Sequence, residues 1–370
     1  MMHAIDNYTD YTLDFTLTPM CPQSLIPVDF SIEPPIVLLY GEAEKILVSF
    51  ILPVIVIFGI LSNSAFLFVL LRVPHMRNAT NCFLANLAVC DTLYIMVAGG
   101  EKFTQYLNSS VNGNNDFLGD YGCAIVSTVI YASYFVSFVF VTLVSVERFF
   151  AVKYPLQHRS VTRKARTVFH AVCSWILGGI LCGLYVSAYS ELKRYCIIWP
   201  DHEPFRKFPN VIGICGSSQT WKSHLALSII FSSYVLSLVI NFSLYSCIIS
   251  SLHQRAVTEE RTSLQRNYNH VISVRNQVAK MLIVNGVVFF VCQTPYRILS
   301  FLGIVLNEEI GDAVWFHPVV RISHMLLYLN SAINAVIYTI GSECYRLAFR
   351  EAFLGKQNPS PLVTPLVELV

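Results

Sequence analysis

Seven long apolar stretches recur along the 370-residue chain, separated by shorter polar segments. A helix needs about 20 largely apolar residues to cross the roughly 30 Å hydrocarbon core of a bilayer, and each stretch is long enough. In lipid a segment must satisfy its own backbone hydrogen bonds, so a helix is the expected form. The stretches cover residues 46–71, 82–100, 124–146, 168–190, 225–252, 281–306 and 314–339. The pattern therefore predicts an all-α fold, a bundle of seven transmembrane helices.

Composition supports a membrane protein. Hydrophobic residues make up 54% of the chain and charged residues only 13%, whereas soluble domains carry about 25% charged residues. The formal net charge is +2, which gives no reason to expect a nucleic-acid partner.

Lysine and arginine predict the orientation in the membrane. They gather in the loops after the third and fifth stretches and in the C-terminal segment, and residues 1–44 contain neither. Because these residues favour the cytoplasmic side, we expect an extracellular, disordered segment 1–45, a seven-transmembrane domain 46–340 and a cytoplasmic helix with a short tail, 341–370. The sequons at Asn7 and Asn108 then lie outside, where glycosylation is expected. The predicted location is the plasma membrane.

Short motifs follow one another along these stretches in a fixed order. They are Gly59 and Asn63, Leu87-Ala88-Val89-Cys90-Asp91, Glu147-Arg148-Phe149, Trp175, the trio Phe289, Cys292 and Pro295, and the run from Asn330 to Tyr338. In this order they resemble the rhodopsin-like (class A) G-protein-coupled receptors over nearly all of residues 46–353. Residues 275–282, 295–297 and 328–334 further resemble receptors for thyrotropin-releasing hormone and related neuropeptides.

That resemblance implies the activity and the partners. The chain would catalyse no reaction itself and would promote nucleotide exchange on a heterotrimeric G protein, of the Gq class with calcium release, after binding an extracellular peptide. Arrestin and membrane lipid are further implied partners.

The resemblance also assigns roles to polar residues inside the bundle. A carboxylate near mid-membrane costs at least about 3 kcal/mol on insertion scales, so Asp91 should face the bundle interior. Its implied partners form a network that holds Na⁺ or is a purely structural hydrogen-bond cluster: Ser137, Asn330, Ser331 and Asn334. The residues implied in G-protein coupling and activation are Glu147, Arg148, Tyr245, Gln293 and Tyr338. Arg275 stands where many relatives carry an acid that pairs with Arg148, which predicts a weak inactive-state lock and appreciable basal signalling.

The resemblance implies a disulfide from Cys123 to the second extracellular loop, which offers Cys196 and Cys215. We favour Cys215, because the loop reads as a hairpin with Cys215 on its second strand, and Cys196 could then pair with Cys21. Connectivity itself cannot be read from a sequence.

Two positions narrow the ligand class. Ile130 replaces the acid of amine receptors and Tyr328 replaces the retinal lysine of opsins, which excludes both groups. The candidate ligand-binding residues are Tyr131, Phe135, Tyr296, Arg297, Arg321 and His324. Their two arginines suit a ligand rich in carbonyls or bearing a carboxylate.

Several positions depart from the family pattern. Gln293 replaces a tryptophan, and Ser237 and Ala335 replace helix-bending prolines, so the fifth and seventh helices should be locally straighter. Residues 342–353 read as an amphipathic helix with Tyr345 and Phe349 towards lipid.

Other functions remain as alternatives. A receptor of the same fold for a non-peptide ligand shares every motif above. A transporter would have inverted repeats and paired helix breaks. A membrane enzyme would have a cluster of metal-ligating or acid–base residues. The sequence shows neither pattern.

Overall fold

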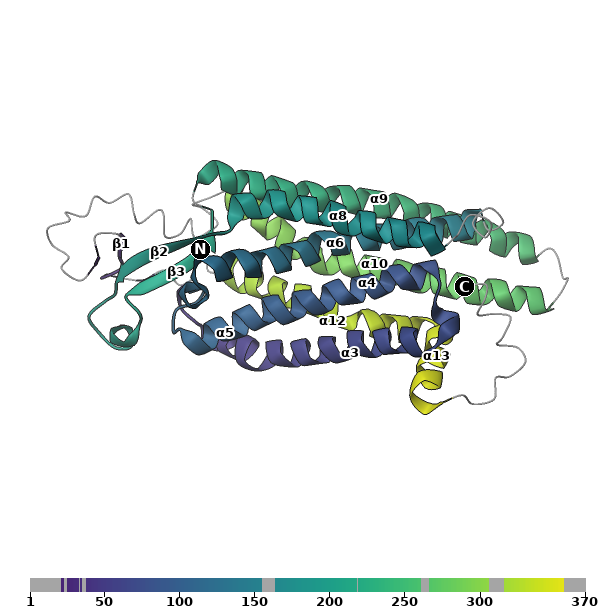
Figure 1. Ribbon diagram of the computed structural model, residues 1–370, viewed down its shortest axis with the longest axis horizontal. Coiled ribbons are helices and arrows are strands. Elements are labelled where there is room, and N and C mark those ends of the chain that lie inside the picture. The colour runs from purple at the N-terminus through teal and green to yellow at the C-terminus, as the bar shows by residue number, and fades with distance from the viewer. Residues whose placement is uncertain are drawn as a thin grey trace.

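The structure is a computed structural model that describes residues 21–22, 25–32, 34, 38–154, 164–217, 219–260, 266–305 and 316–355. Helices run nearly parallel to one long axis, with a small sheet at one end (Figure 1). Asn7 lies outside these residues, and the side chain of Arg275 is likewise not described.

Seven helical spans form the bundle. The first joins α2 (Glu42–Ile46), a π-helical stretch (Leu47–Ile51) and α3 (Leu52–Arg72); the second joins α4 (Ala79–Tyr94), another π-helical stretch (Ile95–Gly99) and α5 (Gly100–Asn108). The others are α6 (Gly119–Lys153), α8 (Lys164–Tyr189), α9 (Thr220–Glu260), α10 (Arg266–Val305) and α12 (Phe316–Gly341). Six spans are long and apolar enough to cross a membrane, and α12 passes the same test together with α13 (Glu343–Leu354), into which it turns by 103°. The predicted seven-helix fold is confirmed.

Local sequence explains several features of these helices. Asn78 caps α4, because its side chain accepts a hydrogen bond from the Asn81 backbone, which satisfies one of the free N–H groups at a helix start. Pro295 lies inside α10. By contrast, α9 contains no proline and runs as one helix of 41 residues past Ser237, and α12 runs unbroken past Ala335.

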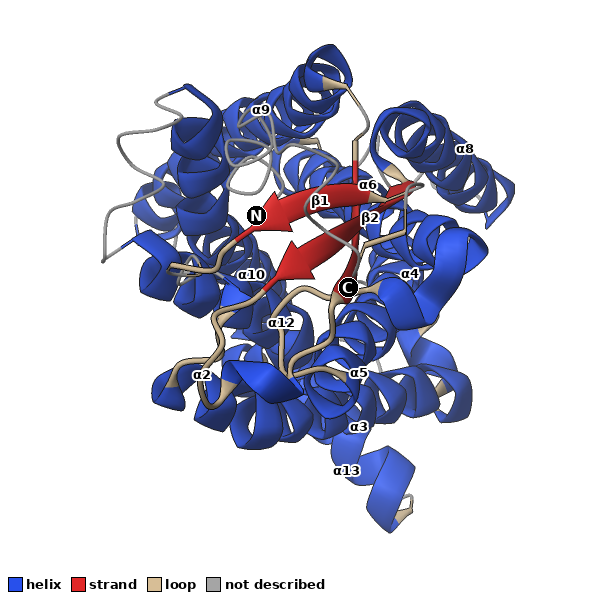
Figure 2. Cartoon of the chain, turned by 90° about the vertical axis from the view of Figure 1, so that its left-hand side faces the viewer, coloured by secondary structure: helices blue, strands red, loops and turns tan. Residues whose placement is uncertain are grey.

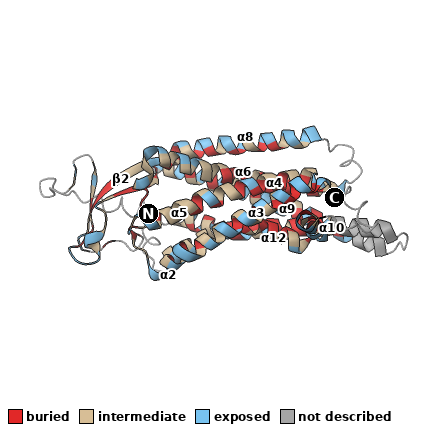
Figure 3. Cartoon of the chain, turned by 60° about the horizontal axis from the view of Figure 1, so that its bottom comes forward, coloured by how far each residue is buried: buried red, intermediate tan, exposed pale blue. Residues whose placement is uncertain are grey.

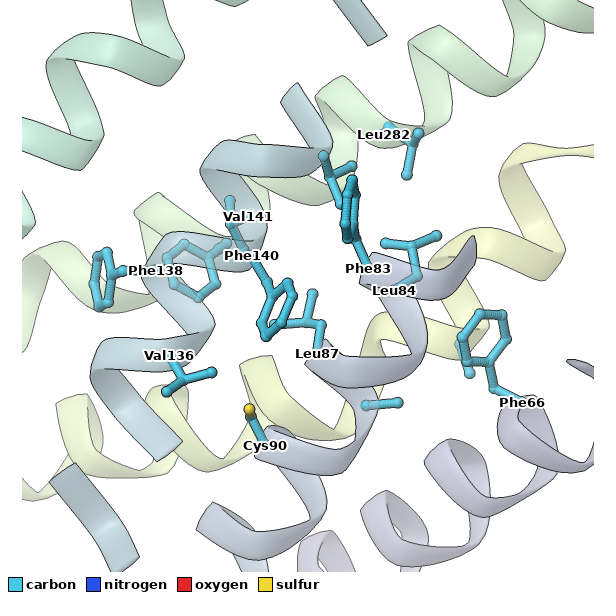
Figure 4. Packing of buried hydrophobic residues seen from close by; sticks show 14 of the residues in the cluster. Phe66, Phe83, Leu84, Leu87, Cys90, Val136, Phe138, Phe140, Val141 and Leu282 are labelled. Atoms are coloured by element: carbon cyan, nitrogen blue, oxygen red, sulfur yellow. The ribbon is translucent and has the colours of Figure 1, made fainter. Parts of the chain in front are cut away.

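Large apolar side chains lie both inside the bundle and on its outside. Figure 4 shows the interior, where Phe83 and Leu87 of α4 meet Phe140 of α6. Ile176, Ile180 and other apolar residues of α8 are exposed, and Figure 3 shows exposed positions along that helix. Such long apolar outer faces are expected where lipid, not water, surrounds the helices.

A three-stranded sheet lies over one end of the bundle. β2 (Glu191–Ile198) and β3 (Val211–Gly216) form an antiparallel hairpin, and β1 (Ile26–Asp29) pairs with β2 in parallel. Figure 2, which looks onto this end, shows β1 and β2 crossing in front of the helices. The sheet has a small core of its own, in which Val28, Phe30, Ile197 and Ile212 are buried.

The expectation of a disordered N-terminal segment was wrong for β1 and α2. Two effects keep β1 in place. The side chains of Val28 and Phe30 are buried in the core of the sheet, and a disulfide joins Cys21 to Cys196 on β2.

The expected orientation of Tyr345 on α13 was also wrong. Its side chain is 1% exposed, stacks on Phe66 at 6.3 Å and donates a hydrogen bond to Asn81. Phe349 is half-buried, while Leu347 and Phe353 are exposed. The sharp turn after α12 places Tyr345 beneath the bundle, so the lipid-facing side of α13 is rotated from the predicted one.

Candidate ligand-binding and coupling sites

Arg297 is a buried cation in α10. Its side chain is 5% exposed, and its guanidinium carbon lies 4.3 Å from the centre of the Tyr134 ring and 5.1 Å from that of Tyr296. Its Nη2 donates to Gln293 Oε1 at 3.3 Å, and its Nε has no hydrogen-bond partner. Among the described residues no carboxylate lies at ion-pairing distance from it. A buried charge left without a counter-ion costs several kcal/mol, so this site suits an anionic or carbonyl group supplied by a ligand.

Aromatic rings form the wall around this arginine. Tyr296 packs against His324 of α12, with ring centres 4.4 Å apart. The ring centre of Tyr131 on α6 lies 3.8 Å from that of Tyr185 on α8. The ring centre of Phe135 lies 6.3 Å from that of Tyr185. The predicted ligand residues Tyr131, Phe135, Tyr296 and His324 therefore belong to one aromatic region with Arg297.

Sequence reasoning missed Tyr134, Tyr185 and Tyr189. The rings of Tyr185 and Tyr189 lie 5.5 Å apart, and their spacing of four residues places them on one face of a helix. That spacing was the available signal, but it does not say whether the face is turned to lipid or to the interior.

Arg321 is not free in the structure. Its Nη1 lies 2.6 Å from Glu44 Oε2, and Glu44, 6% exposed, also accepts a hydrogen bond from Asn112 at 3.1 Å. This ion pair joins α2 to α12. Of the two predicted ligand-binding arginines, Arg297 alone lacks a carboxylate partner among the described residues.

Asp91 lies at the centre of the predicted polar network. It is 2% exposed, Asn334 Nδ2 donates to its Oδ2 at 2.6 Å, and the Ser331 side chain lies close to it. Asn330 is buried with its Nδ2 unpartnered, and Ser137 interacts with the neighbouring Cys90. The carboxylate and hydroxyl oxygens here are of the hard type that suits Na⁺, so the residues present fit that ion.

Arg148 lies at the other end of the bundle. It is 4% exposed, donates a hydrogen bond to Thr80 Oγ1, and lies close enough to Tyr345 and Glu147 to interact with them electrostatically. The Tyr338 side chain lies close to the side chain of Asn285 on α10.

Tyr245 fits into a space that a glycine leaves open. A Cβ on Gly286 would clash with the Tyr245 hydroxyl, so the Tyr245 ring keeps this position because residue 286 has no side chain. The Tyr245 hydroxyl also lies at hydrogen-bonding distance, 3.1 Å, from Ser145 Oγ.

A further polar cluster between α6 and α9 was not predicted. Asn241 is fully buried; its Nδ2 donates to Thr142 at 2.9 Å, and its Oδ1 accepts from Ser145 at 2.6 Å. The Ser237 hydroxyl lies 3.0 Å from Thr142 Oγ1. The residue that replaces the helix-bending proline thus joins a hydrogen-bonded connection between two helices.

Cysteines and one sequon mark the sheet end of the molecule. Cys123 is bonded to Cys215, and Cys21 to Cys196, which is the pairing that we favoured. Asn108 is exposed at the end of α5.

A bundle of long apolar helices with buried ionisable residues in its interior is typical of a multi-pass membrane protein. The family model described as "7 transmembrane receptor (rhodopsin family)" matches residues 62–338, and the chain belongs to this family. Its members are signalling receptors and not enzymes.

Individual relatives agree with the predicted resemblance. The chain is 28% identical to the human thyrotropin-releasing hormone receptor, over 82% of this chain and 76% of that receptor. It is 26% identical to the allatostatin-A receptor of Bombyx mori, over 84% and 81% of the two chains, and 26% identical to human lysophosphatidic acid receptor 4, over 80% and 74%.

Proposed function

We propose that the protein is a plasma-membrane receptor that binds an extracellular neuropeptide and activates a heterotrimeric G protein of the Gq class. The observation that carries the proposal is Arg297, a buried cation among tyrosines with no carboxylate partner among the described residues. Peptides supply carbonyl oxygens and carboxylates, which are the groups that a guanidinium binds best. Two of the relatives are named thyrotropin-releasing hormone receptor and allatostatin-A receptor.

The ligand would enter from the sheet end, which is the extracellular end in this proposal. Disulfides form in oxidising compartments, and both disulfides lie at this end. Tyr131, Phe135, Tyr296 and His324 would contact the ligand beside Arg297, whereas Arg321 would hold α2 against α12 through Glu44. Agonist binding would draw the Arg297 guanidinium away from Gln293, which lies one turn earlier on the same helix.

Coupling would occur at the opposite end. Arg148 would leave Thr80 and contact the G protein, with Glu147, Tyr245 and Tyr338 changing partners as α9 and α10 move apart. The polar network around Asp91 would hold Na⁺ in the inactive receptor, and arrestin would bind the same cytoplasmic end.

A peptide-library screen with a calcium readout in transfected cells tests this function. We expect at least one peptide to raise calcium in cells that express the receptor and not in untransfected cells. Without any peptide, we expect second-messenger output in the expressing cells to exceed that of untransfected cells. Silence across the library, with normal surface expression, contradicts the peptide proposal.

A non-peptide anion is the second candidate ligand. One relative is named as a lysophosphatidic acid receptor, and a phosphate would also complement Arg297. Activation by lysophospholipids without any active peptide would establish this alternative.

A further inference from the structure

A cavity of about 550 Å³ opens at the sheet end, apart from the region around Arg297. Three segments that are distant in sequence form its walls. They are residues 39–45 before the first span, residues 106–110 at the end of α5, and residues 204–208 between β2 and β3. None of the proposed ligand-binding residues lines this cavity.

Aromatic rings from all three segments line the cavity and pack against one another. Tyr40 and Tyr106 meet edge to face with ring centres 5.2 Å apart, and Phe205 and Phe208 do so at 5.3 Å. Trp199 stacks on Phe205 at an interplanar angle of 7°. Burial raises the pKa of the Tyr40 hydroxyl, so it stays a neutral hydrogen-bond donor at physiological pH.

The cavity wall also contains a complete glycosylation sequon, Asn108-Ser109-Ser110. Asn108 and Ser110 are both exposed, as attachment at an Asn-x-Ser site requires. Asn108 Nδ2 donates to Thr104 O at 2.9 Å, and a glycosylated amide keeps one N–H with which to make this bond. A sugar attached to Asn108 therefore starts directly beside the rings.

We propose that Asn108 carries an N-linked glycan and that its innermost N-acetylglucosamine residues occupy this cavity. In the attachment step Asn108 Nδ2 loses a proton and bonds to C1 of the first sugar, while the bond from C1 to the diphosphate of a lipid-linked oligosaccharide breaks. The C–H faces of the sugar rings would lie on Phe205 and Tyr106, and the Tyr40 hydroxyl would donate a hydrogen bond to an acetamido carbonyl. The volume lies within the range of about 300–1,000 Å³ typical of small-ligand sites.

The glycan would connect the three segments around the mouth of the bundle. Lys45 lies in α2, Asn108 at the end of α5 and Phe205 in the loop of the hairpin. The attached sugar therefore stabilises the arrangement of the outer segments without contacting the proposed agonist.

Enzymatic release of the glycan tests the proposal. A peptide amidase that cleaves the bond between asparagine and sugar must reach the inner sugars, so the native full-length receptor in detergent is compared with the same sample after denaturation. Glycopeptide mass spectrometry measures occupancy at Asn108. We expect an occupied site that is released at least about tenfold more slowly from the native receptor, which corresponds to about 1.4 kcal/mol of protection.

Two cavity variants and one control distinguish binding of the glycan in the cavity from general steric hindrance of the amidase by the detergent micelle. Phe205→Leu and Phe205→Ala remove the ring and should raise native release towards the denatured rate, while Phe117→Ala, an exposed ring outside the cavity, should leave it unchanged. Thermal unfolding confirms that each variant is folded, and Phe205→Leu is the milder change. The proposal is overturned if Asn108 is unoccupied, or if the glycan is released equally fast from native and denatured wild type. It is also overturned if protection survives in folded Phe205→Leu, or if a peptide binds the cavity of the unglycosylated receptor.

Discussion

Arg297 is the residue on which the ligand chemistry depends. Its charge is buried, its Nε is unpartnered, and its neighbours are tyrosine faces and one amide. The sequence predicted this residue because an arginine inside an apolar span is rarely accidental. It could not predict that Arg321 is already paired, because Glu44 lies in a segment that the pattern assigned to disorder.

Replacing Arg297 by Gln should weaken agonist binding by about 10- to 100-fold, because hydrogen bonds to charged groups contribute about 1.5–3 kcal/mol. Competition binding measures the change. Arg297→Lys should lose less, and Arg194→Gln, which removes partly exposed ion pairs with Asp116 and Asp120, serves as the matched control. Equal agonist affinity for wild type and Arg297→Gln would show that the ligand does not contact this cation.

The contact between α6 and α9 shows what periodicity misses at the scale of the element. The length of the apolar stretches predicted both helices. It could not predict that Asn241 of α9 bonds to Thr142 and Ser145 of α6, because those contacts depend on how each helix is rotated about its axis. Buried polar groups in a membrane have no water to replace a lost partner, so Asn241 specifies how these helices meet.

Asn241→Ala should destabilise the receptor by about 1–2 kcal/mol, since interhelical hydrogen bonds in membranes contribute about 0.6 and at most about 1.7 kcal/mol each. The apparent thermal midpoint of the purified receptor in detergent reports this loss. Ser243→Ala lies on the exposed side of the same helix, where its hydroxyl bonds only to Val239 O, and should be nearly neutral. If both variants lower the midpoint equally, the cluster is not a specific connection.

The contact between α4 and α12 carries the second prediction at this scale. Asp91 receives the Asn334 side chain, and its charge is what would attract Na⁺. Asp91→Asn removes that charge and keeps the shape, so agonist affinity should lose its dependence on sodium concentration. Sodium sensitivity that persists in this variant would leave a purely structural cluster as the remaining interpretation.

At the scale of the whole molecule, the sequence predicted the bundle and missed one strand of the sheet that covers one end of it. Seven apolar stretches suffice for the helices because length and composition alone decide whether a segment fits a bilayer. The hairpin carrying Cys215 was also expected. β1 was not, because four residues, Ile26–Asp29, carry too little pattern, and their place depends on pairing with distant β2. Tyr345 was misplaced for a similar reason, since the 103° turn decides which face of α13 meets the bundle.

Removing the bond between Cys21 and Cys196 should loosen this layer. In a Cys21→Ser, Cys196→Ser double variant, amide hydrogen exchange should rise in residues 195–198, which pair with β1. The thermal midpoint should fall, because a disulfide contributes about 2–4 kcal/mol. Cys82→Ser removes a free cysteine and controls for the substitution itself. Unchanged exchange in the double variant would mean that β1 is held by the core of the sheet alone.

The central claim, that this bundle converts peptide binding into G-protein activation, is tested most directly by guanine-nucleotide exchange. Membranes containing the receptor and a purified Gq-class protein are incubated with a peptide from the screen, and binding of a non-hydrolysable guanine nucleotide is followed. The account predicts a peptide-dependent rise that Arg148→Ala abolishes while peptide binding remains. No rise with any G-protein class, or a rise that persists in Arg148→Ala, would contradict it.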